Sequence, residues 1–274
     1  MLQSVFLKNK DFHCESKSVR QVVMWALHLL KTEDRKMKRV LLKLSGEAMG
    51  EDGKGFDFAV IRRVAEQLAI LAKQGIQVGV VIGAGNIWRG RQGTDMDRVT
   101  ADHMGMLATV VNSLAMKDAV LHTGTPCKVM TSIPMESVAE VFSARHARRA
   151  LEEGYVVIFA GGTGSPFFST DTAAALRAAE IEADAILLAK NIDGVYDADP
   201  RRVPSAKRYC TISFEKVLQD RLAVMDSAAT AICMDQNIPV TVFALQEENS
   251  IARVCAGEKL GTTVENGIET AFYA

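Results

Sequence analysis

The sequence has 274 residues, and its 32 Lys and Arg against 33 Asp and Glu give a formal net charge of −1. Such a balance provides no bulk attraction to nucleic acid or membranes, and no apolar run approaches the ~20 residues that span a bilayer. The five cysteines form no CxxC pair and the five histidines show no metal-ligand spacing. This favours free thiols in a cytoplasmic protein over a disulfide framework or a zinc site.

The first 36 residues differ from the rest of the chain. Their short apolar segment, residues 22–30, lies among charged residues and lacks the cleavage site of a signal peptide. Met37 is a second candidate start of the functional chain, because Met-Lys-Arg is followed there by an apolar run. We therefore expect a non-catalytic extension at residues 1–36, a single domain at residues 37–265 and a frayed C-terminal tail at residues 266–274.

From residue 40 onward, predicted strands and helices alternate. Helix 98–121 is expected to bury a stripe made by Met104, Leu107, Val111 and Leu114. The alternation predicts an α/β fold whose largely parallel sheet carries helices on both faces and binds ligands where the strands end. The predicted strands are 40–44, 77–82, 128–133, 155–159, 185–190, 240–244 and 261–264, and the predicted helices are 58–73, 98–121, 138–152, 173–181, 213–218, 226–236 and 250–255.

Two glycine-rich turns follow predicted strands. Residues 160–172 read AGGTGSPFFSTDT and lead into an Ala-rich helix that Thr170 or Asp171 would cap. Residues 83–90 read GAGNIWRG. A strand, a glycine turn and a helix N-terminus favour an anion, although the same pattern also fits a structural turn. Neither turn is GxGxxG or a Walker A sequence, which excludes the P-loop kinases.

Several charged or aromatic side chains have two interpretations each. Lys43 lies in an apolar strand, so its ammonium either reaches a ligand crevice or extends into solvent from an edge strand. Arg89 could pair with a phosphate or extend into solvent. Asp102, near a helix start, could interact favourably with the helix dipole or accept hydrogen bonds from ribose hydroxyls. Tyr196 and Asp199, in a later loop, could meet a nucleoside.

Five segments together resemble the bacterial uridylate (UMP) kinases of the amino acid kinase family. They are KLSGE at 43–47, GAGNIWRG at 83–90, ADHMGM at 101–106, GTGSPFFSTD at 162–171 and DGVYDADP at 193–200. The resemblance implies a three-layer αβα sandwich and transfer of the ATP γ-phosphoryl group to UMP, with Mg²⁺ on the ATP phosphates. It also implies a homohexamer, inhibition by UTP and activation by GTP. The alternatives are another small-molecule kinase of this fold and a non-catalytic nucleotide-binding regulator.

The resemblance further implies roles for single residues. Phosphoryl transfer would rest on Lys43, Arg89 and Asp171, without a protein general base, because the UMP phosphate is already ionised at neutral pH. Whether Lys190 or Asn191 meets ATP stays open. The ATP side would comprise Lys43, Leu44, Ser45, Gly46, Gly85, Arg89, Lys190, Asn191, Tyr196 and Asp199, and the UMP side Ala84, Asp102, Thr163, Gly164, Ser165, Pro166, Phe167, Phe168, Ser169 and Thr170.

Overall fold

The computed structural model describes residues 37–50, 55–88 and 95–273. The predicted N-terminal extension and Arg89 therefore lie outside the described residues. The strands are β1 (Arg39–Leu44), β2 (Gln77–Ile82), β3 (Cys127–Thr131), β4 (Glu140–Val141), β5 (Val156–Ala160), β6 (Ala185–Lys190), β7 (Tyr209–Ser213), β8 (Val240–Ala244), β9 (Thr262–Glu265) and β10 (Ala271–Phe272). The helices are η1 (Gly46–Ala48), α3 (Phe58–Lys73), α4 (Arg98–His122), α5 (Ala144–Glu152), α6 (Thr170–Glu180), α7 (Phe214–Gln219), α8 (Ser227–Asp235) and α9 (Ser250–Cys255).

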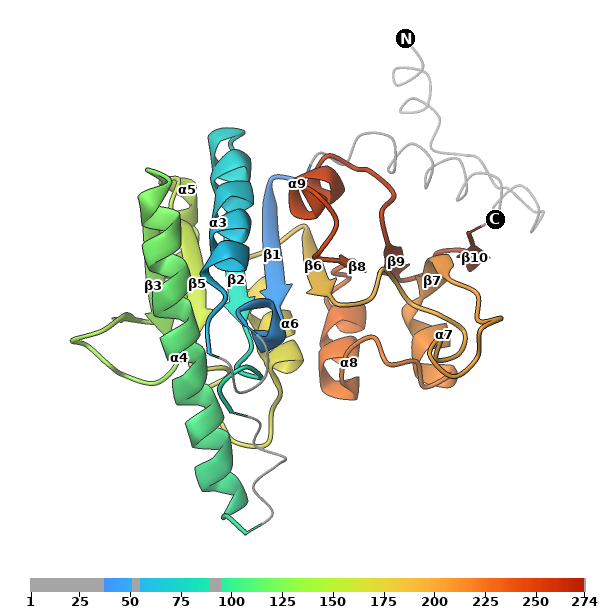
Figure 1. Ribbon diagram of the computed structural model, residues 1–274, viewed down its shortest axis with the longest axis horizontal. Coiled ribbons are helices and arrows are strands. Elements are labelled where there is room, and N and C mark those ends of the chain that lie inside the picture. The colour runs from blue at the N-terminus through green and yellow to red at the C-terminus, as the bar shows by residue number, and fades with distance from the viewer. Residues whose placement is uncertain (1–36, 51–54, 89–94, 274) are drawn as a thin grey trace, which may run out of the picture. The chain divides into compact units, whose positions relative to one another are not determined.

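The ten strands of the described residues form one sheet, in the order β10-β7-β9-β8-β6-β1-β2-β5-β3-β4 (Figure 1). Neighbouring strands are parallel except β8 with β9 and β10 with β7. In the middle of the sheet, Lys43 on β1 lies opposite Val81 on β2 and Leu188 on β6. The predicted, largely parallel sheet is confirmed.

Helices cover both faces of this sheet (Figure 1). Apolar side chains of α3, α4 and α9 belong to the core of one face, and those of α5, α6, α7 and α8 to the core of the other. Along β1 the side chains alternate, so that Leu42 joins the first core and Leu41 the second. The result is a three-layer αβα sandwich, as the resemblance implied.

Helix α3 shows how local sequence sets the elements. Asp57 accepts hydrogen bonds from the backbone N–H groups of Ala59 and Val60 and so caps the helix. Apolar residues at three- and four-residue spacing then place Ile61, Val64 and Leu68, among others, in the core. Each such burial contributes about 1.5–3 kcal/mol. The predicted bounds of this helix are those observed.

The strand order reverses beside β1. The later strands β6, β8, β9, β7 and β10 lie on one side of β1, whereas β2, β5, β3 and β4 lie on the other. In an open parallel sheet, the strand ends at such a reversal leave a crevice that binds ligands. The turns that follow β1, β2, β5 and β6 all lie at this edge, as predicted from their positions after strands.

Helix α4 is rotated relative to the sequence prediction. Met104, Leu107 and Val111, which were expected to be buried, are 37%, 45% and 48% exposed, and only Leu114 packs partly against the core. The buried face instead carries other apolar residues, such as Val110 and Met116, together with polar residues such as Asn112. The prediction was wrong because it counted apolar residues only, whereas buried polar side chains with partners fix the rotation of this helix.

Other segments also differ from prediction, most of them by one or two residues at an end. Helix α5 begins only at Ala144, because the residues before it form the short strand β4. Helix α6 is capped by Ser169 rather than by Thr170 or Asp171. Strand β7 was missed, and β10 pairs with it, so the segment expected to be frayed is hydrogen bonded to the sheet. Strands β4 and β10 are too short to show a periodic pattern, and in β7 only Tyr209 and Ile212 are buried, so that it shows neither an apolar run nor an alternation.

Candidate active site

The turns after β1 and β2 are pressed together, backbone against backbone. A Cβ atom added at Gly46 would lie 2.1 Å from the backbone nitrogen of Gly85 and 2.9 Å from the side-chain oxygen of Asn86. No other residue type therefore fits at Gly46 without moving the second turn. This contact fixes two predicted nucleotide-binding segments relative to each other.

Buried polar side chains of α4 hold both glycine-rich turns. The Asn112 amide donates to the Gly83 carbonyl at 2.7 Å, and the amides of Asn112 and Asn86 bond each other at 2.8 and 3.1 Å. Thr109 accepts a hydrogen bond from the backbone N–H of Gly161 at 2.9 Å. Because these groups are buried and paired, α4 is a rigid support shared by the turns after β2 and β5.

A first pocket of about 260 Å³, here called the Asp102 pocket, opens between these turns and α4. It gathers most of the residues predicted for UMP, although Gly164 and Pro166 do not line it, and it includes Gly85, which was predicted for ATP. Its lining residues are Ala84, Gly85, Trp88, Arg98, Ala101, Asp102, Gly105, Met106, Thr109, Gly162, Thr163, Ser165, Phe167, Phe168, Ser169 and Thr170. Sequence reasoning missed Trp88 and Arg98, which carry no distinctive spacing.

The Asp102 carboxylate shapes the entrance of this pocket. It accepts hydrogen bonds from the Phe167 backbone N–H at 2.8 Å and from Arg98 at 2.9 Å. Phe167 adopts a left-handed backbone with φ of 73° and leaves its ring 67% exposed, beside the exposed ring of Phe168. A strained backbone and two exposed rings are unfavourable without a partner, and both are consistent with a ligand-binding loop.

Lys43 and Asp171 form the charged centre of the site. The Lys43 ammonium lies 2.7 Å from the Asp171 carboxylate, and both side chains are largely buried. Burial lowers the pKa of Lys190. The charge of Asp171 opposes this shift and the charge of Lys43 adds to it, so Lys190 interacts electrostatically with both members of the pair. Lys190 also donates to the carbonyl of Val224. Cations concentrated in this way at a strand edge suit a phosphate chain.

A second pocket of about 390 Å³, here called the Tyr196 pocket, lies on the other side of Lys190. Three residues predicted for ATP line it, namely Lys190, Tyr196 and Asp199. Asn191 does not, since its amide instead donates to Glu47 at 3.0 Å and accepts from Gln246 at 2.7 Å. The remaining lining residues are Ile192, Gly194, Val195, Ala198, Pro200, Arg221, Leu222, Ala223 and Val242.

The other predicted ATP residues lie where β1 runs into η1. The Leu44 side chain is fully buried in the core, and its carbonyl accepts a hydrogen bond from the Gly83 N–H at 2.9 Å. Ser45 precedes η1 and Gly46 begins it, without lining either pocket. The structure thus brings Lys43, Ser45, Gly46 and Asp171 to the same edge of the sheet.

Asp226 is a site residue that sequence reasoning missed. It caps α8 and also accepts a hydrogen bond from Thr172 at 2.9 Å and one from Ser169, the cap of α6. Burial tends to raise its pKa, but the donors Ser169, Ala229 and Thr172 lower the pKa below the ordinary Asp value. The carboxylate therefore ties together the starts of two helices at the site. The sequence predicted it only as the first residue of helix 226–236, without a role at the site.

Comparison with known proteins agrees with this geometry. Residues 38–244 match the model of the amino acid kinase family. A solved UMP kinase from Bacillus anthracis is 39% identical, with a TM-score of 0.85, and the match covers 88% of this chain and 100% of that one. A solved UMP kinase from Ureaplasma parvum is 40% identical, with a TM-score of 0.80, and the match covers 85% of this chain and 100% of that one. The chain belongs to the amino acid kinase family.

Proposed function

We propose that this protein is a UMP kinase, which transfers the γ-phosphoryl group of ATP to UMP and releases UDP and ADP. The observation that carries the proposal is the position of Lys43 and Asp171. Thr170, the neighbour of Asp171, lines the Asp102 pocket, whereas Lys190 lines the Tyr196 pocket. Two nucleotides bound in these pockets would bring their phosphates toward a common charged centre.

UMP is assigned to the Asp102 pocket. The carboxylate of Asp102 suits ribose hydroxyls, and the loop from Thr163 to Thr170 offers backbone groups for a uracil edge. ATP is assigned to the Tyr196 pocket, with Tyr196 and Asp199 on the nucleoside and Lys190 toward the phosphates. The separation of a mononucleotide-sized cleft from a second pocket supports this assignment over an amino acid acceptor.

Catalysis in this proposal consists of positioning and charge neutralisation. Lys43 stabilises negative charge on the transferring group, Asp171 orients Lys43, and Arg89 holds a phosphate. The nucleophile is an oxygen of the UMP phosphate, which needs no deprotonation by the protein. The Lys43–Asp171 ion pair at 2.7 Å supports the first two roles.

Mg²⁺ is the proposed metal. Within the described ranges, no group of three or more His, Cys, Asp or Glu side chains is placed to hold a metal ion. The ion would therefore be held mainly by ATP phosphate oxygens and water, which is a common arrangement for this cation. Bound there, it would neutralise charge on the phosphates.

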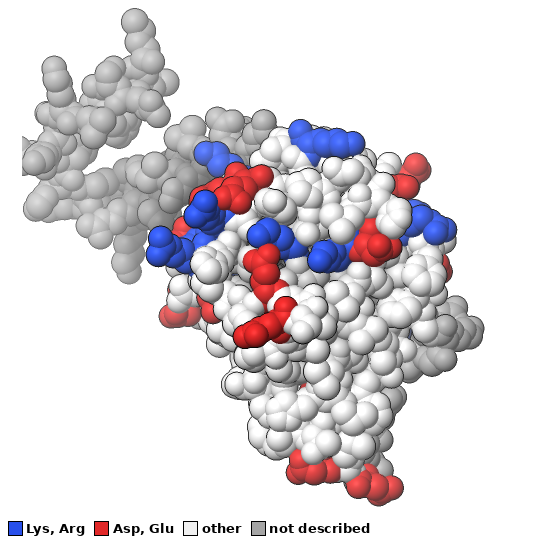
Figure 2. Space-filling model, turned by 90° about the vertical axis from the view of Figure 1, so that its left-hand side faces the viewer, with Lys and Arg blue, Asp and Glu red and all other residues white. Residues whose placement is uncertain are grey.

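Self-association, as a homohexamer, is part of the proposal. The exposed face of α4 carries Met104, Leu107 and Val111 in succession. Figure 2 shows a broad surface without Lys, Arg, Asp or Glu on this side of the molecule, between the charged side chains of its upper part and the acidic ones at its lower tip. By length and composition α4 is also the one helix of the described part that could cross a bilayer, but its other face packs on the sheet as a core helix does. A second copy is the occupant that we propose for the exposed face.

Regulation and location complete the proposal. UTP shares the uracil edge of UMP and is proposed as an inhibitor, and GTP as an activator, on the strength of the sequence resemblance. A cytoplasmic location is supported by the free thiols of Cys127, Cys210, Cys233 and Cys255. Residues 37–265 are proposed as the catalytic domain, with residues 1–36 as a non-catalytic extension and residues 266–274 as a tail.

The test is the release of ADP by the purified protein with Mg-ATP and a panel of acceptors. UMP, CMP, AMP, aspartate, glutamate and acetylglutamate are offered separately. We expect strong turnover with UMP alone. Turnover with an amino acid would reassign the acceptor within the same fold, and binding of ATP without turnover of any acceptor would favour a nucleotide-binding regulator.

A further inference from the structure

The C-terminal segment, residues 266–273, lies against the loop that forms the Tyr196 pocket. Its strand β10 pairs with β7, and the ring of Phe272 stacks on that of Tyr209 with centroids 4.4 Å apart. The backbone N–H of Tyr273 donates to the Arg208 carbonyl at 3.0 Å. Three separate contacts thus hold a segment whose composition predicted fraying.

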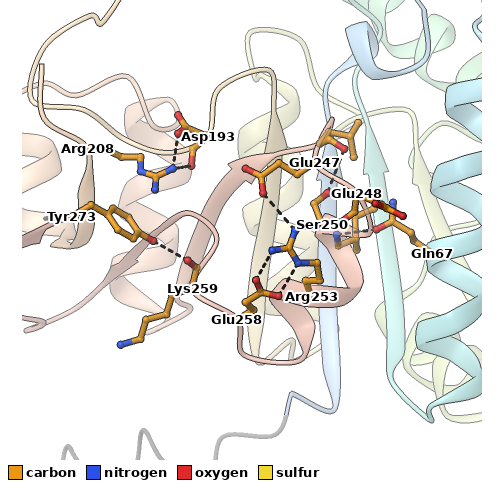
Figure 3. Close-up of polar contacts among 12 residues, drawn as sticks. Gln67, Asp193, Arg208, Glu247, Glu248, Ser250, Arg253, Glu258, Lys259 and Tyr273 are labelled. Carbon is orange, nitrogen blue, oxygen red and sulfur yellow. Dashed lines mark hydrogen bonds and ion pairs between the residues drawn. The ribbon is translucent and has the colours of Figure 1, made fainter. Parts of the chain in front are cut away.

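Tyr273 is fixed at both ends of its side chain. Its hydroxyl lies 2.7 Å from the Gly261 carbonyl oxygen and 3.1 Å from that of Lys259. Its ring lies under the guanidinium of Arg208, with 4.0 Å between the ring centroid and Cζ. In Figure 3 the guanidinium of Arg208 lies between the ring of Tyr273 and the carboxylate of Asp193. The ring therefore limits the positions that Arg208 can take.

Arg208 in turn contacts residues of the loop that forms the Tyr196 pocket. Its guanidinium forms an ion pair with Asp193, whose other carboxylate oxygen accepts from the Tyr196 hydroxyl at 2.8 Å. The stem of Arg208 also packs on Gly194, where an added Cβ would lie 2.9 Å from Arg208 Cδ. Gly194 and Tyr196 both line the pocket. A partly exposed ion pair alone holds its partners weakly, so the ring beneath Arg208 matters.

We infer that Tyr273 is a positioning residue for ATP. Its ring and hydroxyl hold Arg208, Arg208 holds Asp193 and Gly194, and these set the position of Tyr196 on the wall of the pocket. The C-terminal segment is thereby part of the nucleotide site, although Tyr273 does not line the pocket. This inference rests on the proposed function only in naming ATP as the occupant of the Tyr196 pocket.

The test compares Tyr273→Ala with the wild-type chain in two measurements. The first is the dissociation constant for ATP, measured by calorimetry without an acceptor. The second is the set of KM values for ATP and UMP together with kcat. We expect the dissociation constant and the KM for ATP to rise about fivefold to tenfold, while the KM for UMP and kcat stay within about twofold of wild type. Tyr273→Phe, which keeps the ring under Arg208, should show a smaller rise and serves if the alanine variant does not fold.

Tyr155→Ala is the matched control. The ring of Tyr155 also lies near a cation, 5.0 Å from the Lys128 ammonium, but it lines neither nucleotide pocket. This variant should leave ATP binding unchanged. Unchanged ATP binding in the folded Tyr273 variants, or an equal rise of both KM values, would overturn the inference. Wild-type protein that binds ATP but does not phosphorylate UMP would instead overturn the proposed function, and the calorimetric comparison would still decide the role of Tyr273.

Discussion

At the scale of single residues, Lys43 is the side chain on which the proposed catalysis depends most. It is a largely buried cation on the central strand, paired with Asp171 at 2.7 Å. Replacing Lys43 by alanine removes positive charge from the transition state, and we expect kcat to fall by about 10²-fold or more. Steady-state kinetics with UMP and Mg-ATP measure this. Lys128→Ala is the control, because Lys128 pairs with Glu140 at 3.0 Å away from both pockets, and its kcat should be unchanged. Near-normal turnover of Lys43→Ala would contradict the assignment.

Asp226 should make stability depend on pH. Its folded-state pKa is depressed because hydrogen bonds from Ser169, Ala229 and Thr172 outweigh the effect of burial. Such a carboxylate stabilises the fold above its unfolded-state pKa, and this contribution is lost as pH falls through the folded-state value. We expect Asp226→Asn to reduce the free energy of unfolding by about 1–3 kcal/mol near pH 7, and the difference from wild type to narrow below about pH 4. Urea unfolding at several pH values measures both.

The same variant should also affect the site, because Ser169 lines the Asp102 pocket. The KM for UMP is expected to rise in Asp226→Asn. Asp57→Ala is the control, since Asp57 caps α3 and lines neither pocket. It should lose stability without a change in the KM for UMP. Equal kinetic effects of the two variants would show that the Asp226 carboxylate acts only as a helix cap.

Residue positions near the pockets were predictable from sequence only where the residue stands in a local motif, and the roles of these residues stay predictions. Lys43, Asp102 and Tyr196 stand inside recognisable segments. Asp102 and Tyr196 each line a pocket, and Lys43 pairs with Asp171, the neighbour of Thr170 in the Asp102 pocket. Asn112 and Asp226 act on partners 29 and 57 positions away in the chain. Nothing in the neighbouring sequence distinguishes such a residue from an ordinary amide or a helix cap.

At the scale of elements, α4 is both a support for the glycine turns and an exposed apolar surface. Replacing Asn112 by alanine leaves the Asn86 amide and the Gly83 carbonyl without partners. We expect a loss of about 1–3 kcal/mol in the free energy of unfolding, together with a lower kcat/KM for UMP. Gln67→Ala, at a buried amide that accepts a hydrogen bond from the Ile251 N–H at 2.9 Å away from both pockets, should lose stability but keep its kinetics. Unchanged kcat/KM in Asn112→Ala would mean that the turns hold their positions without α4.

Elements could be predicted where their periodicity was strong. Helix α3 and strands β2, β6 and β8 have their predicted bounds, because each is a clean apolar pattern between breakers. The rotation of α4 about its axis was not predictable from the apolar pattern, because one face exposes apolar side chains and the other buries polar ones. Strands β4 and β10 have two residues each and exist only through their partners.

At the scale of the whole molecule, the proposed oligomer should depend on the exposed face of α4. Leu107 is 45% exposed in the middle of this face, so a lysine there would introduce charge into an apolar contact. We expect Leu107→Lys to lower the mass measured by light scattering at micromolar concentration. Leu218→Lys is the control, because Leu218 is 40% exposed on α7 and should leave the mass unchanged. An unaltered mass in Leu107→Lys would place the subunit contact elsewhere.

The arrangement of the whole chain was accessible from sequence because the informative segments are spread along it. Four of the five motifs between Lys43 and Pro200 lie where strands of one sheet end, and the fifth, at 101–106, lies near the start of α4, so the fold brings them to a common edge. The connection from the C-terminal segment to the Tyr196 pocket was not accessible in this way. It depends on packing between β7, β10 and a loop, which only the folded chain displays.

The most direct test of the central claim follows the phosphoryl group itself. The protein is incubated with Mg-ATP labelled at the γ-phosphate and with unlabelled UMP, and the nucleotides are separated. We predict that the label moves to UDP, as its β-phosphate, in step with the formation of ADP. Label appearing only as inorganic phosphate, or remaining in ATP, would contradict the claim that the two pockets join ATP and UMP across Lys43 and Asp171.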